Sequence, residues 1–223
     1  MSPPTGRWFI TGTDTEIGKT MVTACMAAAA ATRGTVVAAK PVASGATPDE
    51  PLRDAAVLAR AAGHAPREWA LAPEPLSPHR AFPADAIDER SLKAWVDALC
   101  ADTILIEGVG GWRVPLRAGA SPLEVCDLAA MCEAGIVMVA PNRIGVINHT
   151  RLTWEAIRSD GLHVRAVILN EHHASAADPS CATNKEDLES WLDVPVISFP
   201  RLPAQPSPSW IDAGNQIWDL LAC

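Results

Sequence analysis

The sequence lacks an excess of positive charge and lacks a long apolar run. Its 223 residues contain 18 lysines and arginines against 26 aspartates and glutamates, which gives a net charge of −8. A nucleic-acid partner is therefore not expected, because such partners normally require a basic surface. The alanine-rich run at 24–31 is much shorter than the roughly 18 apolar residues that a membrane-spanning helix needs. We therefore expect neither nucleic acid nor a membrane as a partner.

The six cysteines form no Cys-x-x-Cys pair and no Cys/His spacing typical of a metal site. Cys25, Cys126 and Cys132 lie in apolar helical surroundings, where a reduced thiol behaves as a small hydrophobic side chain. Buried thiols in a cytoplasmic protein are favoured over a disulfide framework. The N-terminal segment runs directly into an apolar strand, so we expect no signal peptide and a cytoplasmic location.

Short apolar segments alternate with helical patterns along the chain. The predicted strands are 7–11, 35–40, 103–106, 135–140, 164–169 and 194–198. The predicted helices are 17–32, 54–62, 91–100, 121–132, 146–159, 185–192 and 209–221. Strands that are apolar on both faces and alternate with helices indicate a mostly parallel sheet with helices on both faces. With no linker in the sequence, we predict a single α/β domain of the P-loop NTPase-like class spanning residues 1–223.

Three local signals refine these boundaries. Pro41 is expected to stop the second strand, because proline cannot donate to a central ladder. Ser121 and Glu124 have the spacing of a capping box at the start of a helix. The proline-rich stretch 66–83 is interpreted only as a separator between two helices.

Ligands of parallel sheets collect beyond the carboxyl ends of the strands. The first of these turns reads GTDTEIGKT at 12–20, between a strand and a helix, which is typical of a phosphate-binding loop. Lys19 is expected to reach the β- and γ-phosphates, and the Thr20 hydroxyl to bind Mg²⁺. Five residues rather than four separate Gly12 from Gly18, a departure from the general motif. Such a loop indicates a nucleotide but does not indicate the reaction.

Two more charged residues end predicted strands. Lys40 begins the turn KPVASG, and Glu107 precedes the turn GVGGW. We favour Lys40 as a second cation facing the transferring phosphoryl oxygens over a strand-end lysine that extends to solvent. We favour Glu107 as a Mg²⁺ ligand over an ordinary acidic loop residue.

Two further positions stay open between function and helix capping. Asp54 precedes a helical run, and its local sequence favours an N-cap. The segment GVINH at 145–149 begins a helix whose free N–H groups suit a carboxylate ligand. Simple capping explains that segment at least as well.

Four segments together resemble the dethiobiotin synthetase family: GTDTEIGKT at 12–20, KPVASG at 40–45, EGVGGW at 107–112 and GVINH at 145–149. Their order and spacing and the chain length agree with the family, and residues 1–170 match better than the rest. The five-residue gap in the phosphate loop is a property of this family. The resemblance implies a cytoplasmic, homodimeric ATP- and Mg²⁺-dependent cyclo-ligase of biotin biosynthesis.

The resemblance also implies a reaction. One amine of 7,8-diaminononanoate captures CO₂ as a carbamate, and ATP converts the carbamate to a carbamic-phosphoric anhydride. The second amine then closes the ureido ring, which gives dethiobiotin, ADP and phosphate. Each step gathers negative charge in one place, so Lys19 and Lys40 are expected to act together as catalytic residues.

Site residues follow from the matching motifs. The implied metal ligands are Thr20, Asp54 and Glu107. The implied substrate contacts are Ser44, Gly111, Gly145, Val146, Ile147 and Asn148, the last four reaching the active site of the neighbouring subunit. The implied nucleotide contacts are Thr15, Glu16, Ile17, Gly18, Lys19, Thr20, Met21, Glu107, Val109, Gly110, Asn170, Glu171, Pro200, Arg201 and Leu202. Asn170 matches the residue that contacts adenine, with 200–202 as the second wall.

The sequence departs from the family at one point. Some members place a tyrosine near the substrate carboxylate, and this chain contains no tyrosine.

Other functions on the same fold fit less well. Partition and division-site ATPases carry a lysine early in the phosphate loop, where this chain has Asp14. Amidating ligases of cobalamin synthesis are much longer and carry a glutamine-hydrolysing domain that 223 residues cannot hold. A relative that binds nucleotide without catalysis is disfavoured, because the phosphate-loop lysine, Lys40 and Glu107 are all present.

Overall fold

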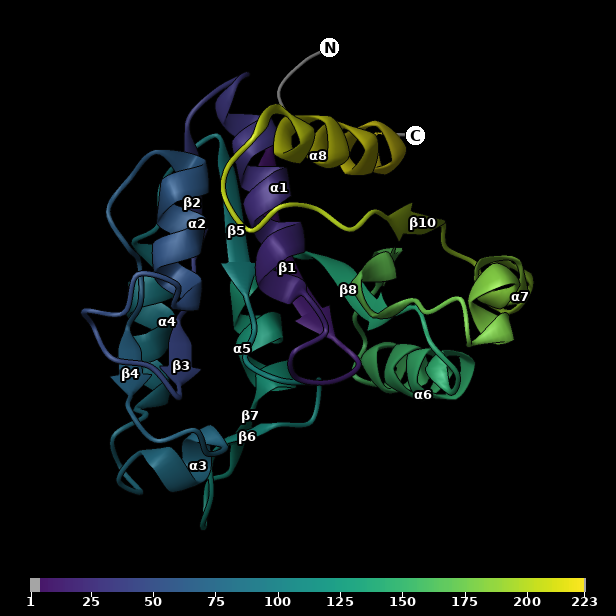
Figure 1. Ribbon diagram of the computed structural model, residues 1–223. Helices are drawn as coiled ribbons and strands as arrows, with labels where there is room; N and C mark the ends of the chain where they lie inside the picture. The colour runs from purple at the N-terminus through teal and green to yellow at the C-terminus, as the bar shows by residue number, and fades with distance from the viewer. Residues whose placement is uncertain (1–4, 223) are drawn as a thin grey trace.

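The computed structural model describes residues 5–222 and places a parallel sheet at the centre of the molecule (Figure 1). Six strands pair in the order β10-β9-β8-β1-β5-β2. They are β1 (Gly6–Gly12), β2 (Val36–Ala39), β5 (Thr103–Glu107), β8 (Gly135–Pro141), β9 (Val164–Asn170) and β10 (Val196–Phe199). All five pairings in this sheet are parallel, which confirms the predicted fold class.

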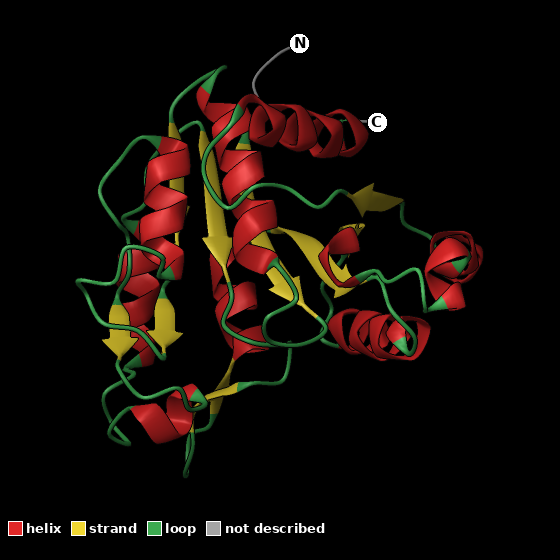
Figure 2. Cartoon of the chain, in the orientation of Figure 1, coloured by secondary structure: helices red, strands yellow, loops and turns green. Residues whose placement is uncertain are grey.

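Helices pack on both faces of the sheet. One face carries α1 (Lys19–Ala31), α2 (Asp54–Ala62) and α8 (Pro208–Leu221). The other carries α4 (Glu89–Asp97), α5 (Val125–Cys132), α6 (Val146–Ser159) and α7 (Asn184–Trp191). In Figure 2, α1 and α2 lie in front of the strands and α8 crosses above them. Within residues 5–222, no helix combines the length and apolar character needed to cross a bilayer.

The sheet separates two hydrophobic cores. Phe9 and Ile10 are adjacent in β1 and fully buried, yet they belong to different clusters of packed side chains. Ile106 and Leu105 in β5 divide in the same way. Successive side chains of a strand point to opposite faces, so a strand covered on both sides must be apolar at every position. That requirement explains why the strands appear as continuous apolar segments in the sequence.

Smaller elements surround the carboxyl edge of the sheet. They are β3 (Val42–Ser44) paired with β4 (Ala70–Ala72), α3 (Pro78–Ala81), β6 (Pro115–Arg117) paired with β7 (Leu123–Glu124), and the 3-10 turns Glu171–His173 and Pro179–Ala182. Strand β2 ends before Pro41, as predicted, and the chain continues in the separate β3–β4 ladder. Both β4 and α3 lie in the stretch 66–83, for which the sequence predicted no element.

Helix α5 starts later than predicted. Its N-cap is Glu124, and Asp127 accepts a hydrogen bond from the Glu124 backbone N–H at 2.7 Å. Glu124 and Asp127 therefore form the capping box, and the predicted box of Ser121 with Glu124 is wrong. The residues ahead of Val125 are drawn into the β6–β7 pairing instead, which keeps them out of the helix.

Helices α1 and α8 approach most closely at Gly214. A Cβ atom at this position would overlap the carbonyl oxygen of Cys25 and come within 2.7 Å of the Ala29 side chain. One turn later, the indole N–H of Trp218 donates to the carbonyl oxygen of Met26 at 2.9 Å. The contact therefore depends on the absence of a side chain at residue 214.

Gly214→Ala should lower the free energy of unfolding by about 1–3 kcal/mol, because the added methyl group forces the two helices apart. For a chain of this size the melting temperature should fall by about 2–4 °C per kcal/mol. Gln216→Ala, on the exposed side of the same helix, is the matched control and should have little effect. Equal melting temperatures for the two variants would contradict the packing argument.

Candidate functional site

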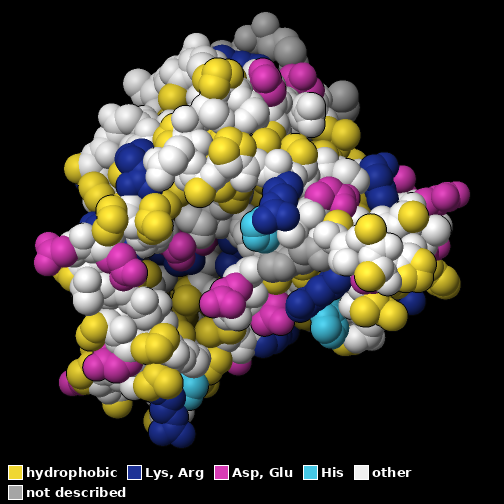
Figure 3. Space-filling view, in the orientation of Figure 1, with side chains coloured by type: hydrophobic (Ala, Val, Ile, Leu, Met, Phe, Trp, Pro, Cys, Tyr) yellow, Lys and Arg dark blue, Asp and Glu magenta, His cyan; other side chains and the backbone are white. Residues whose placement is uncertain are grey.

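The turns that follow β1, β2 and β5 meet at the carboxyl edge of the sheet and enclose a cleft of about 490 Å³. Figure 3 shows this face hollowed left of the centre, with acidic and basic side chains in and around the hollow. Eleven of the predicted site residues line the cleft: Thr15, Glu16, Gly18, Lys19, Thr20, Lys40, Ser44, Asp54, Glu107, Val109 and Gly110.

The phosphate loop joins β1 to α1. Gly18 is the N-cap of α1 and has a φ of +94°, a left-handed conformation that favours glycine. The side-chain amide of Asn170 donates to the carbonyl oxygen of Ile17 at 2.8 Å, and a Cβ at Gly18 would overlap this amide. The loop is thus held from β9, with the positive N-terminus of α1 at the cleft.

Lys19 lies across the phosphate loop. Its Nζ donates to the carbonyl oxygen of Asp14 at 2.7 Å, and the residue is 6% exposed. Burial, assisted by the nearby charge of Lys40, lowers the pKa of Lys19 to about 8. A bound anion would favour the protonated ammonium, so this lysine is suited to a phosphate group.

Lys40 joins two carboxylates at the bottom of the cleft. Its Nζ lies 2.7 Å from Glu107 Oε1, 2.8 Å from Asp54 Oδ2 and 3.1 Å from the carbonyl oxygen of Gly108. Burial by itself lowers the pKa of Lys40, but the charges of Asp54 and Glu107 outweigh it, and the net pKa is raised. Lys40 is therefore a buried cation. Burial also acts on its partner and raises the pKa of Glu107.

Thr20 completes a set of oxygen ligands. Its Oγ1 lies 2.8 Å from Asp54 Oδ1 and 2.9 Å from Glu107 Oε1. Glu107 Oε2 is buried without a hydrogen-bond partner among the described residues. One hydroxyl and two carboxylates are the oxygen ligands that Mg²⁺ prefers, and the unpaired Oε2 leaves one ligand atom free. The arrangement fits a magnesium site that a nucleotide phosphate completes.

Asp54 does not cap its helix. Arg53 occupies the N-cap of α2, and Asp54 is the first helical residue, with its carboxylate directed to Thr20 and Lys40. The N-cap interpretation favoured by the local sequence is therefore wrong. In the part of the chain that the structure describes, no three His, Cys, Asp or Glu side chains gather as a metal site. A metal in the cleft would therefore need the Thr20 hydroxyl as well as the two carboxylates.

The opposite wall of the cleft was missed by the sequence analysis. It is formed by Pro75, Leu76, Ser77 and Pro78. The wall is tied to the turn after β2, because Ser44 Oγ donates to the carbonyl oxygen of Leu76 at 2.6 Å. The signal in the sequence was the length of the proline-rich stretch, since long connections in compact domains often carry function.

Three predicted site residues lie just behind the cleft surface. Ile17 is 2% exposed and packs into the core beneath the phosphate loop, and Met21 is partly buried on α1. Gly111 packs against the backbone carbonyls of Gly12 and Thr13.

The predicted base-binding residues lie apart from the cleft lining. Asn170 holds Ile17 through its amide and accepts the His172 N–H at 3.1 Å. Asn142 Nδ2 donates to both carboxylate oxygens of Glu171, at 2.9 and 3.0 Å. Pro200 and Arg201 are exposed, and Leu202 packs partly against the α1 side of the core.

The start of α6 is also separate from the cleft. Gly145 is its N-cap with a φ of +89°, and Val146 is buried. Gly145, Ile147 and Asn148 line a second concave surface with Arg151 and other residues of the same helix. Within one chain, the predicted substrate contacts at 145–148 are therefore not brought to the Lys40 site.

A parallel sheet whose first strand leads through GTDTEIGKT into a helix, with Lys19 and Thr20 facing a polar cleft, defines a P-loop nucleotide-binding protein. Solved structures share the whole fold. A plasmid partition protein of Borrelia burgdorferi B31 bound to AMPPNP matches with a TM-score of 0.60 at 10% identity, covering 100% of this chain and 99% of that one. The septum site-determining protein MinD of Pyrococcus horikoshii OT3, complexed with Mg-ADP, matches at 0.52 and 20% identity, covering 97% and 93%.

Sequence comparison defines the family within this fold. The family model described as an AAA domain matches residues 7–210. ATP-dependent dethiobiotin synthetase BioD of Ralstonia nicotianae is 38% identical over 211 residues, which cover 87% of this chain and 89% of that protein. The protein of the same name from Pseudomonas aeruginosa is 37% identical and covers 88% and 89%. The chain belongs to the dethiobiotin synthetase family, as the four motifs predicted. The partition and division-site ATPases share its fold alone.

The charge balance at Lys40 can be tested through stability. Lys40→Met should lower the free energy of unfolding by about 3–5 kcal/mol, because Glu107 becomes a buried carboxylate without its cation. In the double variant with Glu107→Gln the loss should be smaller than the sum of the two single losses. Urea denaturation of the four proteins measures this coupling.

Lys93→Met is the matched control for that cycle. Lys93 pairs with Asp97 on the surface of α4, with exposed fractions of 38% and 52%, and should contribute less than about 1 kcal/mol. Additive losses in the Lys40 and Glu107 variants would show that the two groups do not depend on each other.

Proposed function

We propose that this enzyme is an ATP-dependent dethiobiotin synthetase that converts 7,8-diaminononanoate, CO₂ and ATP to dethiobiotin, ADP and phosphate. Family membership supports the ligase class. The observation that carries the proposal is the position of Lys40, a buried cation beside Asp54 and Glu107 in the cleft that the phosphate loop lines. A lysine in this position, outside the phosphate loop, suits phosphoryl transfer to a second substrate.

Three bond changes make up the reaction. A neutral amine of the diamine attacks CO₂, forms a C–N bond and releases a proton, which leaves a carbamate. A carbamate oxygen then attacks the γ-phosphorus, and the bond from that phosphorus to the β–γ bridging oxygen breaks, so ADP leaves. The second amine attacks the carbamoyl carbon, the bond from that carbon to the phosphate oxygen breaks, and phosphate leaves as the ring nitrogen loses a proton.

The cleft suits the charge that this sequence of steps develops. Negative charge collects on the transferring phosphoryl oxygens, and fixed cations in a site shielded from water stabilise it. We assign this role to Lys19 on the phosphate side and to Lys40 on the carbamate side. The backbone N–H groups of 15–21 and the turn at 107–110 are assigned to the nucleotide phosphates.

The metal set supports the same assignment. Thr20, Asp54 and Glu107 would hold Mg²⁺, which when bound neutralises charge on the phosphate oxygens. Ser44 and Gly111 are assigned to the diamine. The wall at 75–78 lines the same cleft and bonds Ser44 through the Leu76 carbonyl, so it is assigned to the same substrate.

The base side of the nucleotide site is assigned to Asn170, Glu171 and the segment 200–202. The Asn170 amide already bonds Ile17 and His172, but an asparagine side chain has two N–H hydrogens and two lone pairs. The side chain can therefore form further hydrogen bonds, and we assign these to adenine.

We also propose a homodimer, in which Gly145–Asn148 at the start of α6 receives the substrate carboxylate in the partner's active site. Large apolar side chains are exposed next to this segment and on α7, with Ile144 at 78%, Leu152 at 58% and Trp191 at 58%. A second copy would bury them.

Free thiols at the buried Cys25, Cys126 and Cys132 suit the reducing cytoplasm in which we place the enzyme.

The direct test incubates the purified protein with 7,8-diaminononanoate, bicarbonate, ATP and Mg²⁺ and follows dethiobiotin by mass spectrometry. We expect product that depends on the diamine, with one phosphate released per ring closed. Parallel reactions omit the diamine or replace ATP with other triphosphates. ATP hydrolysis without the diamine, and no product with it, would instead indicate a nucleotide switch.

Lys40→Gln should lower kcat for ring formation by about 10²–10³-fold, the loss typical of removing one fixed donor from a developing charge. The dissociation constant for a non-hydrolysable ATP analogue should change by no more than a few-fold. Lys93→Gln, a surface substitution of the same chemistry, should leave both values unchanged. Normal product formation by the Lys40 variant would remove this residue from the mechanism.

Lys19→Ala should weaken nucleotide binding itself, because a charge-assisted contact to the phosphates is lost. A loss of about 1.5–3 kcal/mol corresponds to a roughly 10–100-fold larger dissociation constant. Calorimetric titration with the ATP analogue gives this value directly, and wild-type affinity would contradict the assigned role.

A further inference from the structure

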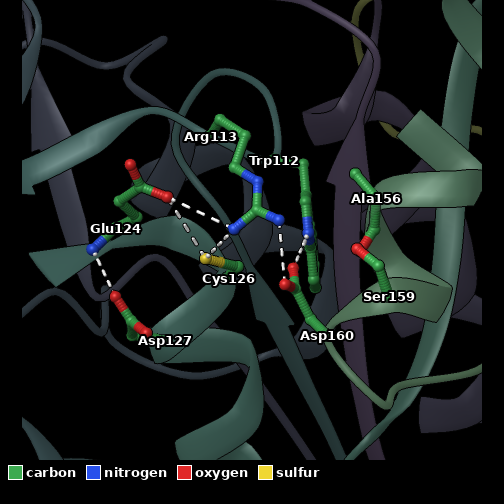
Figure 4. A network of polar contacts seen from close by, with 8 residues as sticks. All are labelled: Trp112, Arg113, Glu124, Cys126, Asp127, Ala156, Ser159 and Asp160. Atoms are coloured by element: carbon green, nitrogen blue, oxygen red, sulfur yellow. Dashed lines mark hydrogen bonds and ion pairs between the residues drawn. The ribbon is translucent and has the colours of Figure 1, made fainter. Parts of the chain in front are cut away.

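Two side chains from the end of the glycine-rich turn converge on Asp160 (Figure 4). The indole Nε1 of Trp112 donates to Asp160 Oδ2 at 2.7 Å, and a guanidinium nitrogen of Arg113 donates to Asp160 Oδ1 at 2.8 Å. Asp160 is the C-cap of α6, and its backbone N–H bonds the Ala156 carbonyl at 3.1 Å. Each carboxylate oxygen therefore holds one donor, at a position that the helix end determines.

This contact is the side-chain anchor at the far end of the turn. Trp112 is 3% exposed and packs in the core, so its N–H requires an acceptor inside the protein. Arg113 makes longer contacts to the start of α5, at 3.2 Å to Cys126 Sγ and 3.5 Å to Glu124 Oε2. The turn is thus fastened between α5 and α6, with its two shortest side-chain contacts at Asp160.

The anchored segment is the wall of the cleft nearest the phosphate loop. Val109, Gly110 and Val114 line the cleft, and Gly111 packs on the backbone of the phosphate loop. Three of the four residues at 108–111 are glycine, so the turn has few side chains with which to hold itself. Its first residue is held by backbone, because the Gly108 N–H donates to the Ile10 carbonyl at 2.9 Å and the Gly108 carbonyl accepts from Lys40 at 3.1 Å. Its far end is held by Trp112 and Arg113 and by the bond from the Val125 N–H to the Val114 carbonyl at 3.0 Å.

We propose that Asp160 is a positioning residue for the diamine side of the cleft, acting through Trp112 and Arg113. This inference rests on the proposed function for the identity of the substrate. Asp160 lines none of the cleft itself. It keeps the turn at 108–114 against the phosphate loop, so that the turn faces the wall at 75–78 at a spacing that accepts the diamine.

Asp160→Ala should raise the KM for the diamine about tenfold, because loss of the anchor displaces the turn that forms one wall. The dissociation constant for the ATP analogue should rise clearly less than this KM, because the phosphate loop keeps its own contacts and only the 107–110 part of the turn is assigned to the nucleotide. A merely unfolded fraction would lower kcat and leave KM unchanged, so the change in KM separates positioning from instability. Asp160→Asn retains one acceptor oxygen and should give an intermediate KM.

Asp193→Asn is the matched control. Like Asp160, Asp193 pairs with an arginine, but its partner is Arg158 of α6, at 3.3 Å, and not a residue of the turn. Trp112→Phe removes only the indole donor, and this variant decides the question if Asp160→Ala does not fold. The KM of Trp112→Phe for the diamine should also rise. Backbone hydrogen exchange of peptides covering 108–114 should be faster in both the Asp160→Ala and Trp112→Phe variants than in Asp193→Asn.

The outcomes separate the two proposals. If the wild-type protein makes dethiobiotin while the Asp160 and Trp112 variants keep its KM and its exchange rates, the positioning role is overturned. If the wild-type protein makes no dethiobiotin, the proposed function fails, and the exchange rates still decide whether Asp160 holds the turn.

Discussion

A buried ammonium group between two carboxylates organises this cleft. Lys40 follows β2, Glu107 ends β5 and Asp54 begins α2. Lys40 and Glu107 could not both be buried without their opposite charges, and the partly exposed Asp54 adds a second carboxylate to the ammonium group. The ion pairs also position Thr20, which bonds both carboxylates at the start of α1. One charge-compensated group thus connects residues at the ends of two strands and the starts of two helices. Preorganisation of this kind reduces what the protein must rearrange during reaction.

The parallel sheet explains how such distant residues come together. The carboxyl ends of β1, β5 and β2 lie side by side, so each following turn opens into the same space. Glycine at two of these turns lets backbone approach backbone, and the neighbouring helices supply the charged ends. The site is therefore a property of one edge of the sheet, and side chains from α6 reach it only indirectly.

The fold was predictable because the centres of the strands are apolar on both faces and because strands that alternate with helices form only a few kinds of parallel sheet. The phosphate loop, Lys40 and Glu107 were predictable because motif residues follow directly from strand ends. Asp54 was predicted in the site only through the family resemblance, since a helix-start aspartate has the same local sequence whether it caps a helix or faces a lysine. The wall at 75–78 and the bond of Trp112 to Asp160 depend on contacts between distant segments, which no local pattern contains. The capping box at Glu124 was misplaced because pairing with β6 competes with the helix.

The packing of α8 on α1 has a consequence for how the molecule forms during synthesis. Trp218 bonds Met26 across 192 positions of sequence, and the alanine-rich face of α1 is covered by residues made near the other end of the described chain. Strand β1 likewise pairs with β5 and β8, which are both synthesised after it. The phosphate loop lies between β1 and α1, so it leaves the ribosome before the segments that pack around these two elements. Contacts of such long sequence separation favour slow folding, and they leave α1 exposed to chaperones in the meantime.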